Sequence, residues 1–308
     1  MLLHCAWIVF HAILWLPLRG DTNPPLFSAG QYDEKLALYL VRISSAMYCP
    51  APAISIWSCV ACSQAGLLQD TKVVIDSESS FQGIVGYSAD RDAIVIAFRG
   101  SSNLKNWIAN VKFVKTKAYN DFPEALVHRG FYELYQKVAA QVLASIQKLR
   151  QEHATAVILV TGHSLGGAIA SICAFELKLL HGLDAHAVYT FGQPRLGNFA
   201  FAQLMNNYVP SLNRVIHAKD VVPHMLPSYL RYYHSKTEVR NVVKIHFKVS
   251  LSVPLQIFYG KFFESYRMCS AKDGEDKTCS NVCAPYSCQS IEDHTSYLNV
   301  TLGDRVQC

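Results

Sequence analysis

The sequence has little charge, no basic cluster and no internal repetition. Charged residues make up 17% of the 308 positions, and 28 basic against 23 acidic side chains leave a net charge of only +5. Lys and Arg are scattered, so the chain lacks the electrostatic footprint of a nucleic-acid-binding protein. Hydrophobic residues reach 51%, which excludes intrinsic disorder for most of the chain.

The only long apolar run lies at the N-terminus. Residues 5–16 are apolar with one exception, a length that suits a signal-peptide core but is too short to cross a bilayer. We predict a signal peptide at residues 1–20 and one domain at 21–308, in a protein that is secreted or enters the lumen of the secretory pathway. An uncleaved anchor or a buried helix is the alternative, because no Lys or Arg precedes the run and Leu18 is large for a cleavage site. No later segment is long enough to be a transmembrane span.

Apolar patterning predicts an α/β protein. Short β-branched runs predict strands at 72–75, 81–87, 93–98, 156–160, 187–191 and 214–217. Helical spacing predicts helices at 34–47, 130–150, 164–180 and 197–207. Strands that alternate with helices indicate right-handed crossovers and a mostly parallel sheet.

A serine flanked by glycines stands where a predicted strand turns into a helix. The run T-G-H-S-L-G-G at 161–167 follows a fully apolar strand and matches G-x-S-x-G. Such a turn strains the backbone at Ser164 and exposes its hydroxyl at a helix N-terminus, which stabilises negative charge. We predict Ser164 as a nucleophile and the Leu165 amide as an oxyanion donor, with His163 pointing away. The alternative is an ordinary helix N-cap.

A serine nucleophile needs a base and an acid that orients the base. On this kind of sheet the acid follows a late strand, as Asp220 does, whereas Asp184 precedes its strand. For the base we prefer His294, and we expect His217 and His224 to be structural. Spacing alone leaves this choice of base open.

These segments together resemble the class 3, or fungal-type, triacylglycerol lipases. The matching runs are A-F-R-G-S-S (97–102), N-W-I (106–108), V-H-R-G-F (127–131), T-G-H-S-L-G-G (161–167), F-G-Q-P-R-L-G-N (191–198), D-V-V-P-H (220–224) and D-H-T-S-Y (293–297). The resemblance implies an α/β-hydrolase fold, with a mostly parallel central sheet, helices on both faces and a short helical lid. It implies a triad of Ser164, Asp220 and His294 with no metal or cofactor.

The resemblance also implies a second oxyanion donor at Ser101 and a lid at about 102–113. The apolar residues of that segment recur at helical spacing: Leu104, Trp107, Ile108 and Val111. Closed, this face would cover the pocket, and open, it would meet a lipid surface. The alternative is that these residues are simply core.

We therefore expect a secreted monomeric lipase that hydrolyses acylglycerol esters at a lipid/water interface. Phospholipase A1, monoacylglycerol lipase and feruloyl esterase on the same fold are alternatives, because an apolar lid does not distinguish a glyceride from a phospholipid substrate. A non-catalytic lipid-binding protein is disfavoured, since every catalytic position is filled. The segment 239–268 is longer than the family pattern, and an extra strand with a packed loop or a second lipid contact would explain it.

The ten cysteines favour an oxidising compartment. The resemblance implies three disulfide bridges: Cys49–Cys308, Cys59–Cys62 and Cys269–Cys279. Cys283 and Cys288 are left near each other and are expected to pair, whereas Cys173 inside a predicted helix is expected to be a buried free thiol. Cys5 leaves with the signal peptide. The sequon at Asn299 predicts an N-glycosylation site.

Overall fold

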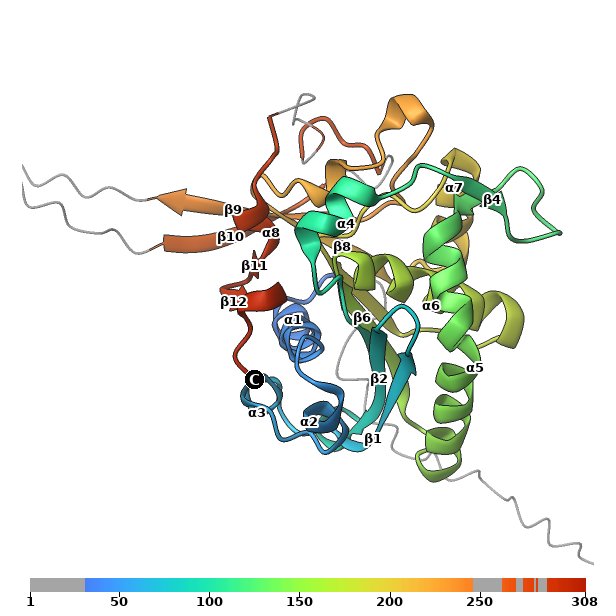
Figure 1. Ribbon diagram of the computed structural model, residues 1–308, viewed down its shortest axis with the longest axis vertical. Helices are drawn as coiled ribbons and strands as arrows, with labels where there is room; N and C mark the ends of the chain where they lie inside the picture. Colours follow the sequence, from blue (N-terminus) through green and yellow to red (C-terminus); the bar gives the residue numbers. More distant parts are fainter. Residues whose placement is uncertain (1–30, 246–261, 270–273, 280, 282–286) are drawn as a thin grey trace, which may run out of the picture.

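An eight-stranded sheet, in the order β1-β2-β3-β6-β7-β8-β9-β10, organises the described part of the chain (Figure 1). The structure, a computed structural model, describes residues 31–245, 262–269, 274–279, 281 and 287–308. The strands are β1 (Gln69–Asp76), β2 (Phe81–Ser88), β3 (Ala93–Phe98), β6 (Val157–His163), β7 (Ala187–Phe191), β8 (Leu212–His217), β9 (Glu238–Ile245) and β10 (Phe262–Met268). Pairs from β3 to β9 are parallel and the outer pairs are antiparallel, so the mostly parallel sheet is confirmed.

Helices cover both faces of this sheet, as the alternation predicts. They are α1 (Glu34–Ala46), α2 (Ala51–Ser55), α3 (Val60–Ala65), α4 (Leu104–Asn110), α5 (Arg129–Glu152), α6 (Leu165–His181), α7 (Phe199–Tyr208) and α8 (Ile291–His294). Figure 1 shows α5 and α6 on one side of the sheet and α1 to α3 on the other, and each side has its own apolar core. Every residue of β3 is buried, which is why its sequence is apolar without alternation.

Element boundaries differ from the predicted ones by a few residues, for local reasons. The helix predicted at 197–207 begins at Phe199, because the Asn198 side chain accepts a hydrogen bond from the Phe201 amide and caps it. Shorter elements complete the chain: β4 (Lys115–Lys117), β5 (Leu126–His128), β11 (Ser296–Tyr297), β12 (Val300–Thr301) and the 3-10 turns η1 (Ala89–Arg91), η2 (Val222–His224), η3 (Ser228–Leu230) and η5 (Gly303–Arg305).

The two ends of the segment 239–268 form neighbouring strands at one edge of the sheet. β9 pairs in parallel with β8, and β10 pairs antiparallel with β9. These two strands agree with the extra-strand alternative. The apolar middle of the segment, residues 246–261, and the predicted signal peptide 1–20 lie outside the described residues. No described helix combines the length and apolarity needed to cross a bilayer.

The cysteines are arranged as expected where the structure describes them. The bridges Cys49–Cys308, Cys59–Cys62 and Cys269–Cys279 are present, and Cys173 is a buried free thiol. Cys288 is disulfide-bonded, and Cys283, its predicted partner, lies outside the described residues. The first bridge fastens the C-terminal residue beside α3, where the Val60 amide donates to the Cys308 carbonyl oxygen.

Candidate active site

A strained serine joins β6 to α6. Ser164 has φ 59° and ψ −128°, and a positive φ is rare for any residue other than glycine. The flanking glycines permit the turn, because a Cβ on Gly162 would lie 2.2 Å from the Gly166 carbonyl oxygen. A Cβ on Gly166 would lie 2.2 Å from the Phe98 carbonyl oxygen. The predicted strand, turn and helix around Ser164 are all present, but its hydroxyl, which the sequence predicts to be exposed, is buried.

Asp220 and His294 form a buried pair. His294 Nδ1 lies 2.9 Å from Asp220 Oδ1 and 2.8 Å from Oδ2, and both side chains are fully buried. A carboxylate only accepts hydrogen bonds, so Nδ1 carries a proton, and in the neutral form of this ring Nε2 keeps its lone pair. Within the described residues, neither His294 Nε2 nor Ser164 Oγ has a hydrogen-bond partner. The Oγ–Nε2 hydrogen bond of a serine triad is therefore not formed in this structure, and in other enzymes such bonds often tighten only when substrate binds.

His163 ties His294 to the turn that carries the serine. Its Nε2–H donates to the His294 carbonyl oxygen at 2.8 Å, and its Nδ1 accepts from the Tyr48 hydroxyl at 2.6 Å. Burial, and then the charge of His294, lower the pKa of His163 well below its ordinary value, so this ring stays neutral. Both of its nitrogens are occupied and neither is left for Ser164. His163 therefore positions the backbone of His294.

Asp220 is held by groups other than His294. The Val222 amide donates to its Oδ1 at 2.8 Å, and the Tyr297 hydroxyl donates to its Oδ2. Burial, and then the Asp220 carboxylate, raise the pKa of Tyr297 well above its ordinary value, so the phenol keeps its proton. Three donors thus fix the orientation of the carboxylate that faces His294.

We expect Tyr297→Phe to lower kcat on a soluble ester about 10-fold with little change in KM. The buried Asp220 carboxylate would lose the hydrogen bond from the Tyr297 hydroxyl, which is worth about 1–3 kcal/mol. Steady-state kinetics will measure this effect. Tyr119→Phe is the matched control, since Tyr119 is also buried and also donates to a carboxylate, that of Glu176. An equal fall in kcat in both variants would contradict the positioning role of Tyr297.

The other candidate histidines, His217 and His224, make different contacts from His294. His217 Nδ1–H donates to the Asp293 carbonyl oxygen at 3.0 Å. His224 is largely buried, and burial lowers its pKa to about 4. Neither of these rings bonds Asp220 among the described contacts, whereas His294 does.

Ser101 and Leu165 both adjoin the serine. Leu165 is the first residue of α6, directly after Ser164. Ser101 follows Gly100, where a Cβ would lie 3.1 Å from the Ser164 Cβ. The predicted oxyanion donors therefore come from two segments that meet at the nucleophile.

Helix α4 lies beside an apolar cavity that reaches the serine turn. The helix spans Leu104–Asn110 within the predicted lid at 102–113, and Asn103 caps it by accepting from the Asn106 amide. Its apolar positions are half-buried and the positions between them are exposed, so α4 is not core. A cavity of about 610 Å³ lies beneath it. The apolar residues lining this cavity are Trp107, Val111, Val114, Phe131, Leu134 and Leu165.

One histidine holds the C-terminal end of the predicted lid. The Phe131 amide donates to His128 Nδ1 at 3.2 Å, which caps α5, and His128 Nε2–H donates to the Lys112 carbonyl oxygen at 2.5 Å. This pair of bonds requires a neutral ring. Burial, and then the charge of Lys115, lower the pKa of His128.

We expect the free-energy difference between the wild type and His128→Asn to depend on pH. At pH 8 the ring is neutral in both the folded and the unfolded wild type. The variant keeps a side chain that can cap α5, because Asn accepts well at an N-cap, but it loses the hydrogen bond to the Lys112 carbonyl oxygen, which costs about 1 kcal/mol. Because the folded-state pKa is lowered, wild-type stability falls as pH drops below about 6.5, and the variant escapes this loss. Urea unfolding from pH 8 to pH 5 measures it. His181→Asn, at an exposed position, is the control, and a difference that is constant with pH would contradict a neutral His128 ring in the folded protein.

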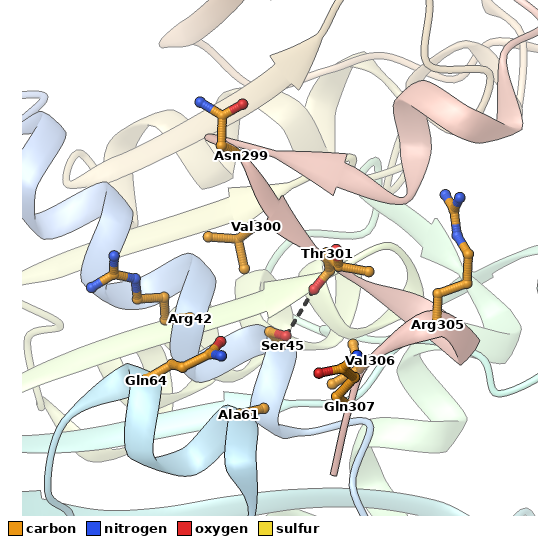
Figure 2. A pocket seen from close by; sticks show the side chains of 10 residues that line it. All are labelled: Arg42, Ser45, Ala61, Gln64, Asn299, Val300, Thr301, Arg305, Val306 and Gln307. Carbon is orange, nitrogen blue, oxygen red and sulfur yellow. Dashed lines mark hydrogen bonds between the residues drawn. The ribbon is translucent and has the colours of Figure 1, made fainter.

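A second cavity, of about 370 Å³, lies between α1, α3 and β12 (Figure 2). Figure 2 shows the guanidinium groups of Arg42 and Arg305 pointing to different sides, so they do not converge on one ligand. The Ser45 hydroxyl donates to the Thr301 carbonyl oxygen at 2.8 Å across the cavity floor. Asn299, the predicted glycosylation site, is exposed in the turn between β11 and β12 and lines this cavity.

Sequence reasoning missed several residues that support this site. Tyr297 lies in the same D-H-T-S-Y run as His294, and that run was the sequence signal that could have identified it. Arg195 lies in the F-G-Q-P-R-L-G-N run and donates to the Pro223 carbonyl oxygen at 3.3 Å, close to Asp220 in the chain. Its partner Glu275 had no signal in the sequence.

Sequence comparisons point to one family. The model of the class 3 lipase family matches residues 95–230. The lipase of Rhizomucor miehei is 31% identical over 274 residues, which are 86% of this chain and 68% of that protein. Secreted mono- and diacylglycerol lipase 1 of Fusarium solani is 36% identical over 174 residues, which are 55% of this chain and 51% of that protein. The chain thus spans between about half and two thirds of the length of these curated relatives.

Solved structures agree with this family. The triacylglyceride lipase of Rhizomucor miehei superposes with a TM-score of 0.74 at 28% identity, covering 89% of this chain and 98% of that one. A triacylglycerol lipase whose catalytic centre is a serine protease triad gives a TM-score of 0.74 at 29% identity, covering 88% and 96%. These similarities confirm the α/β-hydrolase fold expected from the sequence. The chain belongs to the class 3 lipase family.

Proposed function

We propose that the protein is a secreted serine ester hydrolase that acts on acylglycerols at a lipid/water interface. The observation that carries this proposal is the buried Asp220–His294 pair, with an unpartnered Nε2, beside the strained turn of Ser164. The names of its relatives support the substrate class, since they are lipases and mono- and diacylglycerol lipases. The disulfide bridges support an oxidising compartment, and with it the signal peptide at residues 1–20.

The geometry supports an acyl-enzyme mechanism. His294 Nε2 takes the Ser164 proton as Oγ attacks the ester carbonyl, and Asp220 stabilises the imidazolium that forms. The Leu165 amide and Ser101 donate to the oxyanion, aided by the N-terminus of α6. His294 then protonates the leaving alcohol. A water molecule, deprotonated by His294, releases the fatty acid and regenerates Ser164.

Helix α4 acts as a lid in this proposal. Its apolar face covers a cavity that Leu165 also lines, so an acyl chain in that cavity would place its carbonyl carbon near Ser164. Opening exposes the face that carries Trp107, and a lipid surface replaces the contact of this ring with Phe131, where the ring centroids are 6.4 Å apart.

One acyl-release assay tests the proposal. It compares emulsified triglyceride, phosphatidylcholine vesicles and a short soluble ester at equal enzyme concentration. We expect the highest rate on the triglyceride emulsion, rising steeply where the emulsion forms. A higher rate on phosphatidylcholine would indicate a phospholipase A1, and hydrolysis of the soluble ester alone would contradict an interfacial enzyme.

A further inference from the structure

An apolar surface containing two cations lies beside the mouth of the α4 cavity. We call it the hinge rim, and it consists of Phe113, Val114 and Lys115, which follow the lid, and Tyr229, Leu230 and Arg231, at η3. Its four apolar side chains are exposed, with Tyr229 at 82% and Phe113 at 50%. Large apolar side chains gathered at an exposed place are typical of an interaction surface.

Two contacts join the halves of the rim. The Lys115 ammonium donates to the Leu230 carbonyl oxygen at 2.9 Å and lies 3.9 Å from the centroid of the Tyr232 ring. The Arg129 amide donates to the Val114 carbonyl oxygen at 2.9 Å, which fixes the rim to the start of α5. Val114 also lines the α4 cavity, so the rim borders the cavity mouth.

The cations of the rim are not neutralised by the protein. Within the described residues, neither Lys115 nor Arg231 forms an ion pair with a carboxylate. Burial, and then the charge of Arg231, lower the pKa of Lys115, which shows that the two cations repel each other. Exposed Lys112 and Arg129 add positive charge at the cavity, and Glu133 is the acid that lines it.

This arrangement matches one kind of partner. A bilayer surface with anionic phospholipid offers phosphate oxygens to the two cations and an acyl region to the exposed Phe113, Tyr229 and Leu230 side chains. We propose that the hinge rim docks the protein on anionic phospholipid surfaces, through contacts separate from the lid face of α4. The inference rests on the proposed function and deepens it, because docking here would hold the lid hinge and the cavity mouth against the lipid.

Vesicle binding tests the rim in full-length protein. A Ser164→Ala background prevents hydrolysis, and co-sedimentation measures the partition coefficient on phosphatidylcholine vesicles with and without phosphatidylglycerol. We expect Lys115→Gln/Arg231→Gln to lower partition onto the anionic vesicles about 30-fold, because each cation near such a surface contributes about 1 kcal/mol and every 1.4 kcal/mol is tenfold in the partition coefficient. Partition onto pure phosphatidylcholine should stay the same.

The matched control removes two exposed cations elsewhere, from α1 and α5, as Lys35→Gln/Lys148→Gln. Equal losses in both double variants would mean that net charge alone attracts the protein and would overturn the rim. Wild-type binding by the rim variant would overturn it as well. In parallel, the rim variant with Ser164 intact is assayed on a short soluble ester. Unchanged turnover there shows that ester hydrolysis is intact, so a negative vesicle result would then contradict the hinge rim and not the proposed function.

Discussion

Replacing Ser164 by alanine is expected to lower kcat/KM on a short soluble ester by at least about 10⁴-fold. The hydroxyl is buried, has no hydrogen-bond partner among the described residues and precedes the N-terminus of α6, so it has no structural bond to lose. Removing the nucleophile of a triad leaves only the catalysis that binding and the oxyanion hole provide. Steady-state release of a chromogenic alcohol measures the loss of kcat/KM, and circular dichroism checks that the variant is folded.

Ser171→Ala is the matched control for this experiment. Ser171 is also a buried serine of α6, and its single hydroxyl proton has two acceptors within reach, Gln193 Oε1 at 2.7 Å and the Gly167 carbonyl oxygen at 3.1 Å. We expect it to retain activity within about 10-fold, since it loses one ordinary hydrogen bond. If Ser164→Ala hydrolyses the ester as fast as Ser171→Ala, the assigned nucleophile is wrong.

The features that the sequence predicted well have local causes. The turn at Ser164 depends on two nearby glycines, since a Cβ at Gly162 or Gly166 would collide with backbone. Strand β3 is apolar throughout because both of its faces are covered, and short helix caps such as Asn198 fix where helices begin. Such signals lie within a few residues of what they determine, so a pattern search finds them.

The base could not be selected in that way because its position depends on long-range contacts. His294 reaches Asp220 since the chain before α8 pairs with the chain after β8. The Ser290 amide donates to the Lys219 carbonyl oxygen, and the Lys219 amide donates to Asp293 Oδ2. No spacing rule within the sequence reports these pairings, so the chain order favoured His294 but left the choice open until the family resemblance supported it.

Glu275 is the residue that the sequence gave least reason to notice, and we expect Glu275→Gln to destabilise the protein by about 3–5 kcal/mol. Both its oxygens accept from Arg195 at 2.7 Å, and the side chains of the pair are only 5% and 11% exposed. The neutral amide would leave the Arg195 cation buried without compensation. Urea unfolding at pH 7 measures the loss.

The pH dependence of this loss has a definite sign. Burial raises the pKa of Glu275, but the bonds and charge of Arg195 outweigh it and the net pKa is lowered. A carboxyl whose folded pKa is lowered stabilises the protein above its unfolded pKa, about 4.3, and this contribution disappears as pH falls through the folded value. The stabilities of the wild type and Glu275→Gln should therefore approach each other as pH falls below about 4.3 and converge below the lowered folded pKa.

Removing both partners distinguishes a buried charge from a general packing defect. We expect Arg195→Met/Glu275→Leu to be more stable than Glu275→Gln, because no unpaired charge is then buried. Activity should not recover with it, since Arg195 also donates to the Pro223 carbonyl oxygen and thereby holds the loop that begins at Asp220. Exposed Glu124→Gln is the control. If the losses in free energy of unfolding of Arg195→Met and Glu275→Leu simply add in the double variant, the two side chains do not act as a buried pair that holds the Asp220 loop.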